Sequence, residues 1–280
     1  MVRVSIVIPV YNEETAVRET IDRIKKLAIP DSEIIAINDG STDKSGKALD
    51  KIKDIRVIHQ PYNLGYGASL KKALREARGE WVCITDADGT YPIADIPKLL
   101  EYVPQYDMVV GARTGSNVHI PLARKPAKWM LGKLANILSG RKIDDINSGM
   151  RVFNREKALE FMKLYPAGFS FTTTITLSFL TNDYSVKYIP INYFKRKGTS
   201  HMRPKEFFRF IALMFRITLH FRPLKFFLIP GALLVLAGLA YGTIQGILSP
   251  TGLGEFPILL VILGALVLMF GALADITARK

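Results

Sequence analysis

Residues 81–90 read Trp-Val-Cys-Ile-Thr-Asp-Ala-Asp-Gly-Thr, and this stretch decides the class of fold. Its first five residues have the length and composition of a buried β-strand, and two carboxylates, Asp86 and Asp88, follow directly. An Asp-Gly step is first of all a turn signal. Two carboxylates where a strand opens into a loop also supply the hard oxygen ligands that Mg²⁺ or Mn²⁺ prefers. The stretch therefore predicts either a plain turn or a site that holds a divalent cation against a diphosphate.

Strand and helix patterns alternate on both sides of this stretch. Predicted strands cover residues 4–8, 33–37, 56–59, 81–85 and 108–110, and predicted helices cover residues 15–27, 44–53, 69–78 and 93–102. This alternation predicts an α/β domain with a mostly parallel sheet. The loops after four of the strands are rich in polar residues, at 11–14, 38–43, 63–67 and 86–88. Because ligands bind at the carboxyl ends of parallel strands, we expect these loops to share one site.

Two long uncharged stretches close the sequence. Residues 226–254 carry no charge, and after Glu255 residues 256–274 carry none either. Each stretch reaches the roughly 20 apolar residues that cross a bilayer. We therefore predict transmembrane spans at about 226–248 and 256–274; the alternative is a pair of buried helices in a soluble core.

The positions of Lys and Arg predict the orientation of this hairpin. The link at 249–255 has neither residue, whereas Arg222 and Lys225 precede the first span and Arg279 and Lys280 follow the second. By the positive-inside rule both ends, and with them the N-terminal domain, are expected in the cytoplasm.

The net charge of +13 is concentrated in one segment. Residues 112–225 carry 21 Lys/Arg against 6 Asp/Glu, whereas residues 1–111 carry 15 against 17. The position of this block before the spans favours anionic lipid headgroups and a phosphate-bearing acceptor. No recognition helix or stacking module accompanies the charge, so we expect no nucleic-acid partner. Cys83 is the single cysteine and allows no internal disulfide.

Three regions follow from these patterns. Residues 1–204 form the α/β domain, residues 205–225 a membrane-interface segment, and residues 226–280 the transmembrane hairpin. The stretch 205–221 has the pattern of a basic amphipathic helix, which lies in the interface or, alternatively, is a core helix with one wetted stripe. Residues 127–138 are a second candidate for the interface.

With these loops in place, the sequence resembles family-2 glycosyltransferases with the GT-A fold, close to the dolichyl-phosphate mannose synthase and polyprenyl-phosphate glycosyltransferase branch. The resemblance runs from Ser-Ile-Val-Ile-Pro-Val-Tyr-Asn-Glu at 5–13 to the hairpin. In that family the first loop and the Asp-Gly-Ser loop hold the nucleotide, and the Asp-x-Asp motif binds Mg²⁺ or Mn²⁺ and the diphosphate. The resemblance thus implies a metal at Asp86 and Asp88, and nucleotide contacts from Pro9, Tyr11, Glu13, Asp39 and Asp86.

Three further segments match the acceptor side of that family. They are Gly-Ala-Arg at 111–113, Asp-Ile-Asn-Ser-Gly-Met-Arg at 145–151, and a late basic loop at 195–200. The resemblance implies that the catalytic residues are Asp86, Asp88, Arg113, Arg124 and Arg196. It places the acceptor against Arg113, Arg124, Lys128, Asp145, Ser148, Arg151, Arg196 and Ser200.

The sequence departs from the family pattern at three points. Thr90 stands where mannose synthases often have Gln, and His201 stands where the late loop normally has Lys. The Gln-x-x-Arg-Trp motif of processive synthases is absent, which argues against chain polymerisation.

The implied function is inverting transfer of one sugar, mannose or glucose, from a GDP- or UDP-linked donor to dolichyl or polyprenyl phosphate. We expect an integral protein of the cell or endoplasmic reticulum membrane with its catalytic domain in the cytoplasm. A phosphate dianion needs basic residues to hold it but no general base to activate it, and the sequence shows no clear base. Two alternatives remain: transfer to another lipid, such as a diacylglycerol or a lipid-linked saccharide, and a catalytically silent membrane scaffold.

Overall fold

The computed structural model describes residues 3–118, 133, 136, 140–168, 170–195, 212, 215, 219, 223–248 and 254–278. The chain divides into two compact units. The first comprises Met1–Ile137 and Arg141–Phe210, and the second comprises Leu138–Gly140 and Ile211–Lys280. Each unit is described by itself.

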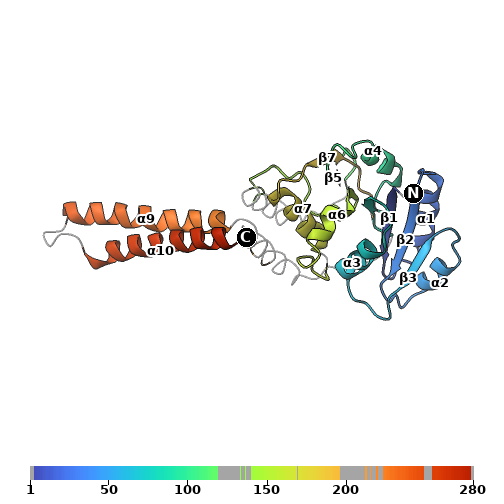
Figure 1. Cartoon of the computed structure of the whole chain (residues 1–280), viewed down its shortest axis with the longest axis horizontal. Coiled ribbons are helices and arrows are strands. Elements are labelled where there is room, and N and C mark those ends of the chain that lie inside the picture. Colours follow the sequence, from blue (N-terminus) through green and yellow to red (C-terminus); the bar gives the residue numbers. More distant parts are fainter. Residues whose placement is uncertain are drawn as a thin grey trace. The chain divides into compact units, whose positions relative to one another are not determined.

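A β-sheet flanked by helices organises the first unit (Figure 1). It has seven strands, in the order β3-β2-β1-β4-β6-β5-β7. Neighbouring strands are parallel except that β6 runs antiparallel to β4 and β5. The expected α/β domain with a mostly parallel sheet is therefore confirmed. The strands are β1 (Val4–Val10), β2 (Ser32–Asn38), β3 (Arg56–His59), β4 (Trp81–Ile84), β5 (Met108–Ala112), β6 (Arg151–Asn154) and β7 (Val186–Pro190).

Alternate residues of the strands pack against helices on the two faces of the sheet. Even-numbered residues of β1, such as Ile6 and Ile8, join one core cluster with Val17, Ile21 and Leu99. The odd-numbered Val7 is equally buried but lies on the other face, and α3 contacts β1 and β2. The helices of this unit are α1 (Val17–Lys26), α2 (Ser45–Asp50), α3 (Tyr66–Glu76), the short η1 (Ile93–Asp95), α4 (Ile96–Leu100), α6 (Arg155–Glu160) and α7 (Phe171–Thr181).

Strands β1 and β4 separate at their carboxyl ends. Their pairing ends at Val7 and Ile84, and the last bond runs from the Thr85 amide to the Val7 carbonyl at 3.2 Å. The Val7 carbonyl points toward β4, and the Val10 carbonyl points toward β2. Because the backbone polar groups of successive residues point to opposite sides of a strand, the backbone nitrogen of Pro9 faces β4. Proline lacks an N–H, and at this position no ladder bond is lost. The two strands therefore open where the strand order reverses, which is where open α/β sheets bind ligands.

The predicted helices lie where the structure has helices, but several of them begin or end at other residues than predicted. The helix expected at 69–78 begins earlier, at Tyr66, because Gly65 adopts a φ of 103° and ends the preceding loop. The helix expected at 93–102 is split into η1 and α4, with Pro97 in the first turn of α4. The strands β6 and β7 and the helices α6 and α7 were not predicted. Residues Phe171–Leu180 of α7 are all buried, so the sequence has no amphipathic period there.

The second unit contains two long apolar helices, α9 (Pro223–Leu248) and α10 (Glu255–Ala278), which pack side by side (Figure 1). Segments Phe226–Leu248 and Glu255–Thr277 are long and apolar enough to cross a membrane. Only 17% of the residues in each span's most apolar window are buried, which argues against a soluble core. Gly231 and Gly264 let the backbones approach: a Cβ on Gly264 would lie 2.8 Å from the Gly231 carbonyl oxygen.

The expected interface helix at 205–225 and the candidate at 127–138 lie almost entirely outside the described residues. Of these stretches, the structure describes 133, 136, 212, 215, 219 and 223–225.

Candidate active site

The carboxyl edge of the sheet gathers the polar loops that the sequence singled out. The loop after β1 and the loop after β2 are joined through Asn12, whose Oδ1 accepts the Thr42 amide at 2.8 Å. The backbone N–H of Asn12 in turn donates to the Ser41 hydroxyl at 3.1 Å. Asn12 has a φ of 55°, a conformation that asparagine tolerates well. The two loops therefore form one connected wall of the site.

The expected nucleotide contacts begin on this wall. Pro9 is buried at the end of β1, and Tyr11 is partly buried just after it. Glu13 is 8% exposed; its amide donates to the Ser45 hydroxyl at 2.8 Å, and its carbonyl accepts the amides of Ala16 and Val17. Glu13 thus lies at the turn that leads into α1. The structure brings Pro9, Tyr11 and Glu13 to one edge, and their contact with a nucleotide stays a prediction.

Asp39 accepts three hydrogen bonds from within the chain. Its carboxylate accepts the amides of Leu64 and Gly65 at 2.8 and 2.9 Å and the Gln60 side-chain amide at 3.0 Å. These bonds hold the loop between β3 and α3, and the N-terminus of α3 favours a negative charge there. Asp39 is 3% exposed. The structure therefore shows that Asp39 organises the loops around the site, and its expected nucleotide contact stays a prediction.

Asp86 and Asp88 lie in the loop after β4, at the opening between β1 and β4. Asp88 is 7% exposed, and its Oδ1 accepts the Thr90 hydroxyl at 2.6 Å and the Thr90 amide at 3.1 Å. Thr90, at the position where mannose synthases often have Gln, thus orients the second carboxylate of the motif. Asp86 accepts a hydrogen bond at Oδ1 from the Tyr66 hydroxyl at 3.0 Å. Both carboxylates are consequently fixed by hydroxyl donors.

Two tyrosines in this region were not among the predicted site residues, although Tyr66 lies in the polar loop 63–67 that was expected at the site. Tyr66 is the first residue of α3, and Tyr91 follows Thr90. Burial raises the pKa of Tyr66 well above its ordinary value, and the Asp86 charge adds to the shift. Burial likewise raises the pKa of Tyr91. Both hydroxyls therefore stay protonated at neutral pH.

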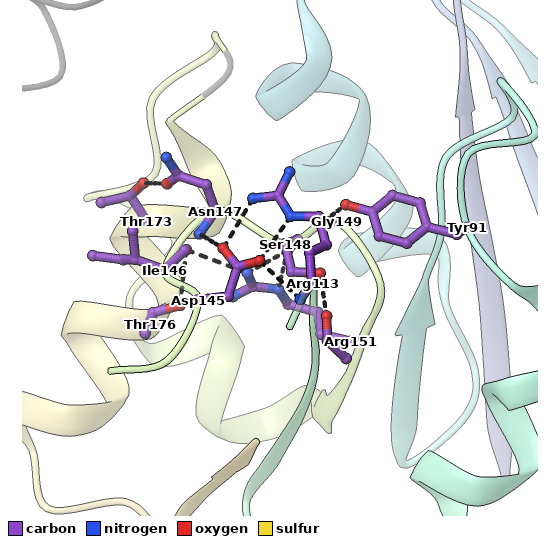
Figure 2. Close-up of polar contacts among 11 residues, drawn as sticks. Tyr91, Arg113, Asp145, Ile146, Asn147, Ser148, Gly149, Arg151, Thr173 and Thr176 are labelled. Carbon is purple, nitrogen blue, oxygen red and sulfur yellow. Dashed lines mark hydrogen bonds and ion pairs between the residues drawn. The ribbon is translucent and has the colours of Figure 1, made fainter. Parts of the chain in front are cut away.

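The acceptor-side segment 145–151 is held to the end of β5 by an ion pair. Figure 2 shows the Asp145 carboxylate against the Arg113 guanidinium, with Nε to Oδ2 at 2.7 Å and Nη2 to Oδ1 at 2.9 Å. The backbone N–H groups of Arg113 and Asn147 also donate to this carboxylate. The Asp145 side chain is fully buried, whereas that of Arg113 is 15% exposed and lies 5.2 Å from the Tyr193 ring. A forked pair of this kind fixes geometry as well as charge.

The side chains of Arg151 and Ser148 form hydrogen bonds within the chain. Arg151 is fully buried and donates to the carbonyls of Ser148 and Thr172 and to the Thr176 hydroxyl (Figure 2). Burial also lowers its pKa. The Ser148 hydroxyl donates to the Gly111 carbonyl. Backbone carbonyls thus accept from both side chains, which hold the segment in place, and the expected acceptor contacts of Arg151 and Ser148 stay predictions.

Four of the expected residues lie outside the described part of the chain. They are Arg124, Lys128, Arg196 and Ser200. Their roles stay predictions from the sequence. Among the residues that the structure describes, no group of three or more His, Cys, Asp or Glu side chains is placed to hold a metal ion.

Comparison with known proteins places this geometry in a family. The model of glycosyl transferase family 2 matches residues 5–161, more than half of the chain. The chain belongs to this family. The family assignment accounts for the opening between β1 and β4 with its Asp-x-Asp loop, and it confirms the resemblance that the motifs indicated.

Several curated proteins are similar to this family member. The low-salt glycan biosynthesis hexosyltransferase of Haloferax volcanii is 30% identical over 71% of this chain and 49% of its own length. The undecaprenyl-phosphate mannosyltransferase of Micrococcus luteus is 28% identical over 71% of this chain and 87% of its own. The dolichyl-phosphate hexose transferase of Haloferax volcanii is 28% identical over 71% of this chain and 86% of its own length. The chain therefore spans about half the length of the first relative and most of the other two.

Solved structures confirm the GT-A fold. The glucosyl-3-phosphoglycerate synthase of Mycobacterium tuberculosis, in complex with Mn²⁺, UDP and phosphoglyceric acid, superimposes with a TM-score of 0.61. The match covers 77% of this chain and 78% of that chain at 18% identity. At this identity the likeness concerns the fold.

Replacing Arg151 tests its structural role. The Arg151→Leu change leaves the Ser148 and Thr172 carbonyls without their buried donor, so we expect the free energy of unfolding to fall by about 2–5 kcal/mol. Arg141→Leu is the control, because Arg141 forms an exposed ion pair with Asp183, and the loss of an exposed pair is expected to cost less than about 1 kcal/mol. Urea denaturation of the detergent-solubilised protein measures both. Equal stability of the two variants would contradict the buried role.

Proposed function

We propose that the chain transfers one sugar, mannose or glucose, from a GDP- or UDP-linked donor to a polyprenyl or dolichyl phosphate, with inversion at the anomeric carbon. The observation that carries the proposal is the Asp86/Asp88 pair at the opening between β1 and β4 in a family 2 chain. The similar proteins support the acceptor, since two of them are named for transfer to undecaprenyl phosphate and dolichyl phosphate.

A divalent cation fits the donor chemistry of this site. Asp86 and Asp88 offer carboxylate oxygens from one short loop, which suits Mg²⁺ or Mn²⁺. The hydrogen bonds from Tyr66 and Thr90 keep these carboxylates oriented. The remaining ligands would come from the donor diphosphate and water, which is the usual arrangement for Mg²⁺. When bound, the cation would stabilise the charge that develops on the leaving diphosphate. The Mycobacterium tuberculosis structures include complexes with Mn²⁺ and with Mg²⁺, which supports this part of the proposal.

The acceptor side favours a phosphate over a hydroxyl acceptor. A hydroxyl acceptor needs a general base, and the carboxylate of this segment, Asp145, is buried in its pair with Arg113. Helix α7, which meets the segment through Thr173 and Thr176, carries no acidic residue. A phosphate monoester with a second pKa near about 6 is already an oxyanion at pH 7. The basic residues of the 112–225 segment would hold it, and Arg113, Arg124 and Arg196 are the proposed contacts.

The hairpin supports a membrane location for this reaction. The spans Phe226–Leu248 and Glu255–Thr277 expose apolar residues along their length, as a lipid-facing helix pair does. We propose that both ends of the hairpin, and the catalytic unit with them, lie on the cytoplasmic side. The support is the distribution of Lys and Arg around the spans.

Removing the charge of Asp88 tests the metal site. With Asp88→Asn we expect transfer to fall by at least about 100-fold, because the amide is a poor ligand for a hard cation. EDTA should abolish wild-type transfer, and Mg²⁺ or Mn²⁺ should restore it. The control is Asp54→Asn, whose carboxylate is 82% exposed. Full activity of Asp88→Asn in EDTA would refute the assignment.

The acceptor is tested with membranes that contain the protein and a panel of radiolabelled nucleotide sugars. We expect label to enter lipid only when polyprenyl phosphate is present, and free polyprenol to be inert because it lacks the oxyanion. Arg124→Gln or Arg196→Gln should raise the KM for polyprenyl phosphate by roughly 10- to 150-fold, the equivalent of about 1.5–3 kcal/mol for one charge-assisted bond. The KM for the nucleotide sugar serves as the internal control. Efficient glycosylation of free polyprenol would favour a base-assisted reaction instead.

The proposed topology is tested by cysteine labelling. A cysteine introduced in the 249–255 link should react with a membrane-impermeant maleimide from the outer side only. A cysteine at position 280 should react only after the membrane is opened. Because Cys83 is buried, it gives little background signal. Labelling of the link from the cytoplasmic side would overturn the orientation.

A further inference from the structure

We propose that Tyr66 is a positioning residue for Asp86, and that the backbone of Gly149 forms the opposite wall of a socket for this carboxylate. The inference rests on the proposed function, in which Asp86 is a metal ligand. It assigns a role to two residues, Tyr66 and Gly149, that were not among the predicted site residues.

The first wall of the socket comes from α3. The Tyr66 hydroxyl donates to Asp86 Oδ1 at 3.0 Å, across 20 residues of sequence. Tyr66 is the first residue of α3, and the Ala68 amide in the same turn donates to the Ala167 carbonyl at 3.0 Å. The adjacent Gly65 amide donates to the buried carboxylate of Asp39. The hydroxyl is therefore presented by a helix end that is fixed on two sides.

The second wall comes from the acceptor-side segment. A Cβ on Gly149 would lie 2.9 Å from Asp86 Oδ2 and 3.1 Å from Oδ1, so the glycine backbone lies directly against the carboxylate. The Gly149 amide donates to the Tyr91 hydroxyl at 2.6 Å (Figure 2). Any side chain at position 149 would displace Asp86 or break this bond. The socket therefore joins three separate parts of the chain around one carboxylate.

A carboxylate ligand holds a cation well only when its orientation is fixed before the cation arrives. Groups that hydrogen-bond to metal ligands typically change metal affinity by about 10- to 100-fold when they are removed. Tyr66 can fix the carboxylate without binding the metal itself. Because Gly149 belongs to the same segment as Asp145, the socket also links the proposed metal site to the Arg113–Asp145 pair.

The test measures Mn²⁺ binding by electron paramagnetic resonance on the full chain in detergent, with UDP and, separately, with GDP. Tyr66→Phe removes only the hydroxyl and keeps the ring, and we expect Mn²⁺ to bind about tenfold more weakly. The matched control is Tyr184→Phe: the Tyr184 hydroxyl donates to the Glu160 carboxylate at 2.8 Å, just before β7 and therefore at the opposite, amino edge of the sheet. This control should bind Mn²⁺ as the wild type does. Thermal unfolding of each variant reports whether the fold is kept.

A second variant keeps the proposal testable if Tyr66→Phe does not fold. Gly149→Ala acts on the socket from the other side and should also weaken Mn²⁺ binding, whereas Gly168→Ala should not, because a Cβ there meets nothing within 4 Å. If Tyr66→Phe folds and binds Mn²⁺ as tightly as the wild type, the positioning role is wrong but the proposed metal site is not. If Tyr66→Phe does not fold, wild-type Mn²⁺ affinity in Gly149→Ala leads to the same conclusion. A wild-type protein that binds no Mn²⁺ with either nucleotide overturns the proposed metal site and the socket with it.

Discussion

The separation of β1 and β4 beyond Val7 is the constraint on which the site depends. Up to Val7 the two strands share a parallel ladder, and beyond it each strand leads into its own loop. Pro9 favours this separation, because a residue without an N–H cannot donate the next ladder bond toward β4. The first loop and the Asp-x-Asp loop are consequently brought to one edge of the sheet, where the strand order reverses.

The arginines of the acceptor side are not equivalent, although the sequence presents them as one basic block. Arg151 is fully buried and bonded to backbone carbonyls, so it supports the segment 145–151 from inside. Arg113 forms a forked pair with Asp145 and keeps part of its surface exposed beside Tyr193. Burying a guanidinium is tolerated only where its donors are satisfied, and all three nitrogens of Arg151 donate within the chain.

The predicted elements are those in which apolar and polar residues recur with the spacing of a strand or a helix. Five strands of the sheet and four helical regions through residue 112 follow from alternation and from turn residues. Helix α7 was missed because Phe171–Leu180 are buried on every side, which removes the polar face that marks a helix. At the site, Asp86 and Asp88 could be found from local sequence, whereas Tyr66 and Gly149 reach Asp86 only through tertiary contacts. Ser148 and Arg151 have side chains suited to a ligand, and only the structure shows that backbone carbonyls occupy them.

Two unrelated features of the chain point to the same class of acceptor. Helix α7 meets the acceptor-side segment with threonines and no carboxylate, and Asp145 is paired with Arg113, so the described acceptor side favours a nucleophile that is already ionised. The helices α9 and α10 are apolar enough to cross a bilayer and expose that apolar surface, which is an environment for a lipid. A phosphate on a long isoprenoid chain satisfies both requirements at once. A free sugar or a soluble alcohol satisfies neither: its hydroxyl would need a base, which the described acceptor-side segment and α7 do not offer, and it gains nothing from an apolar surface.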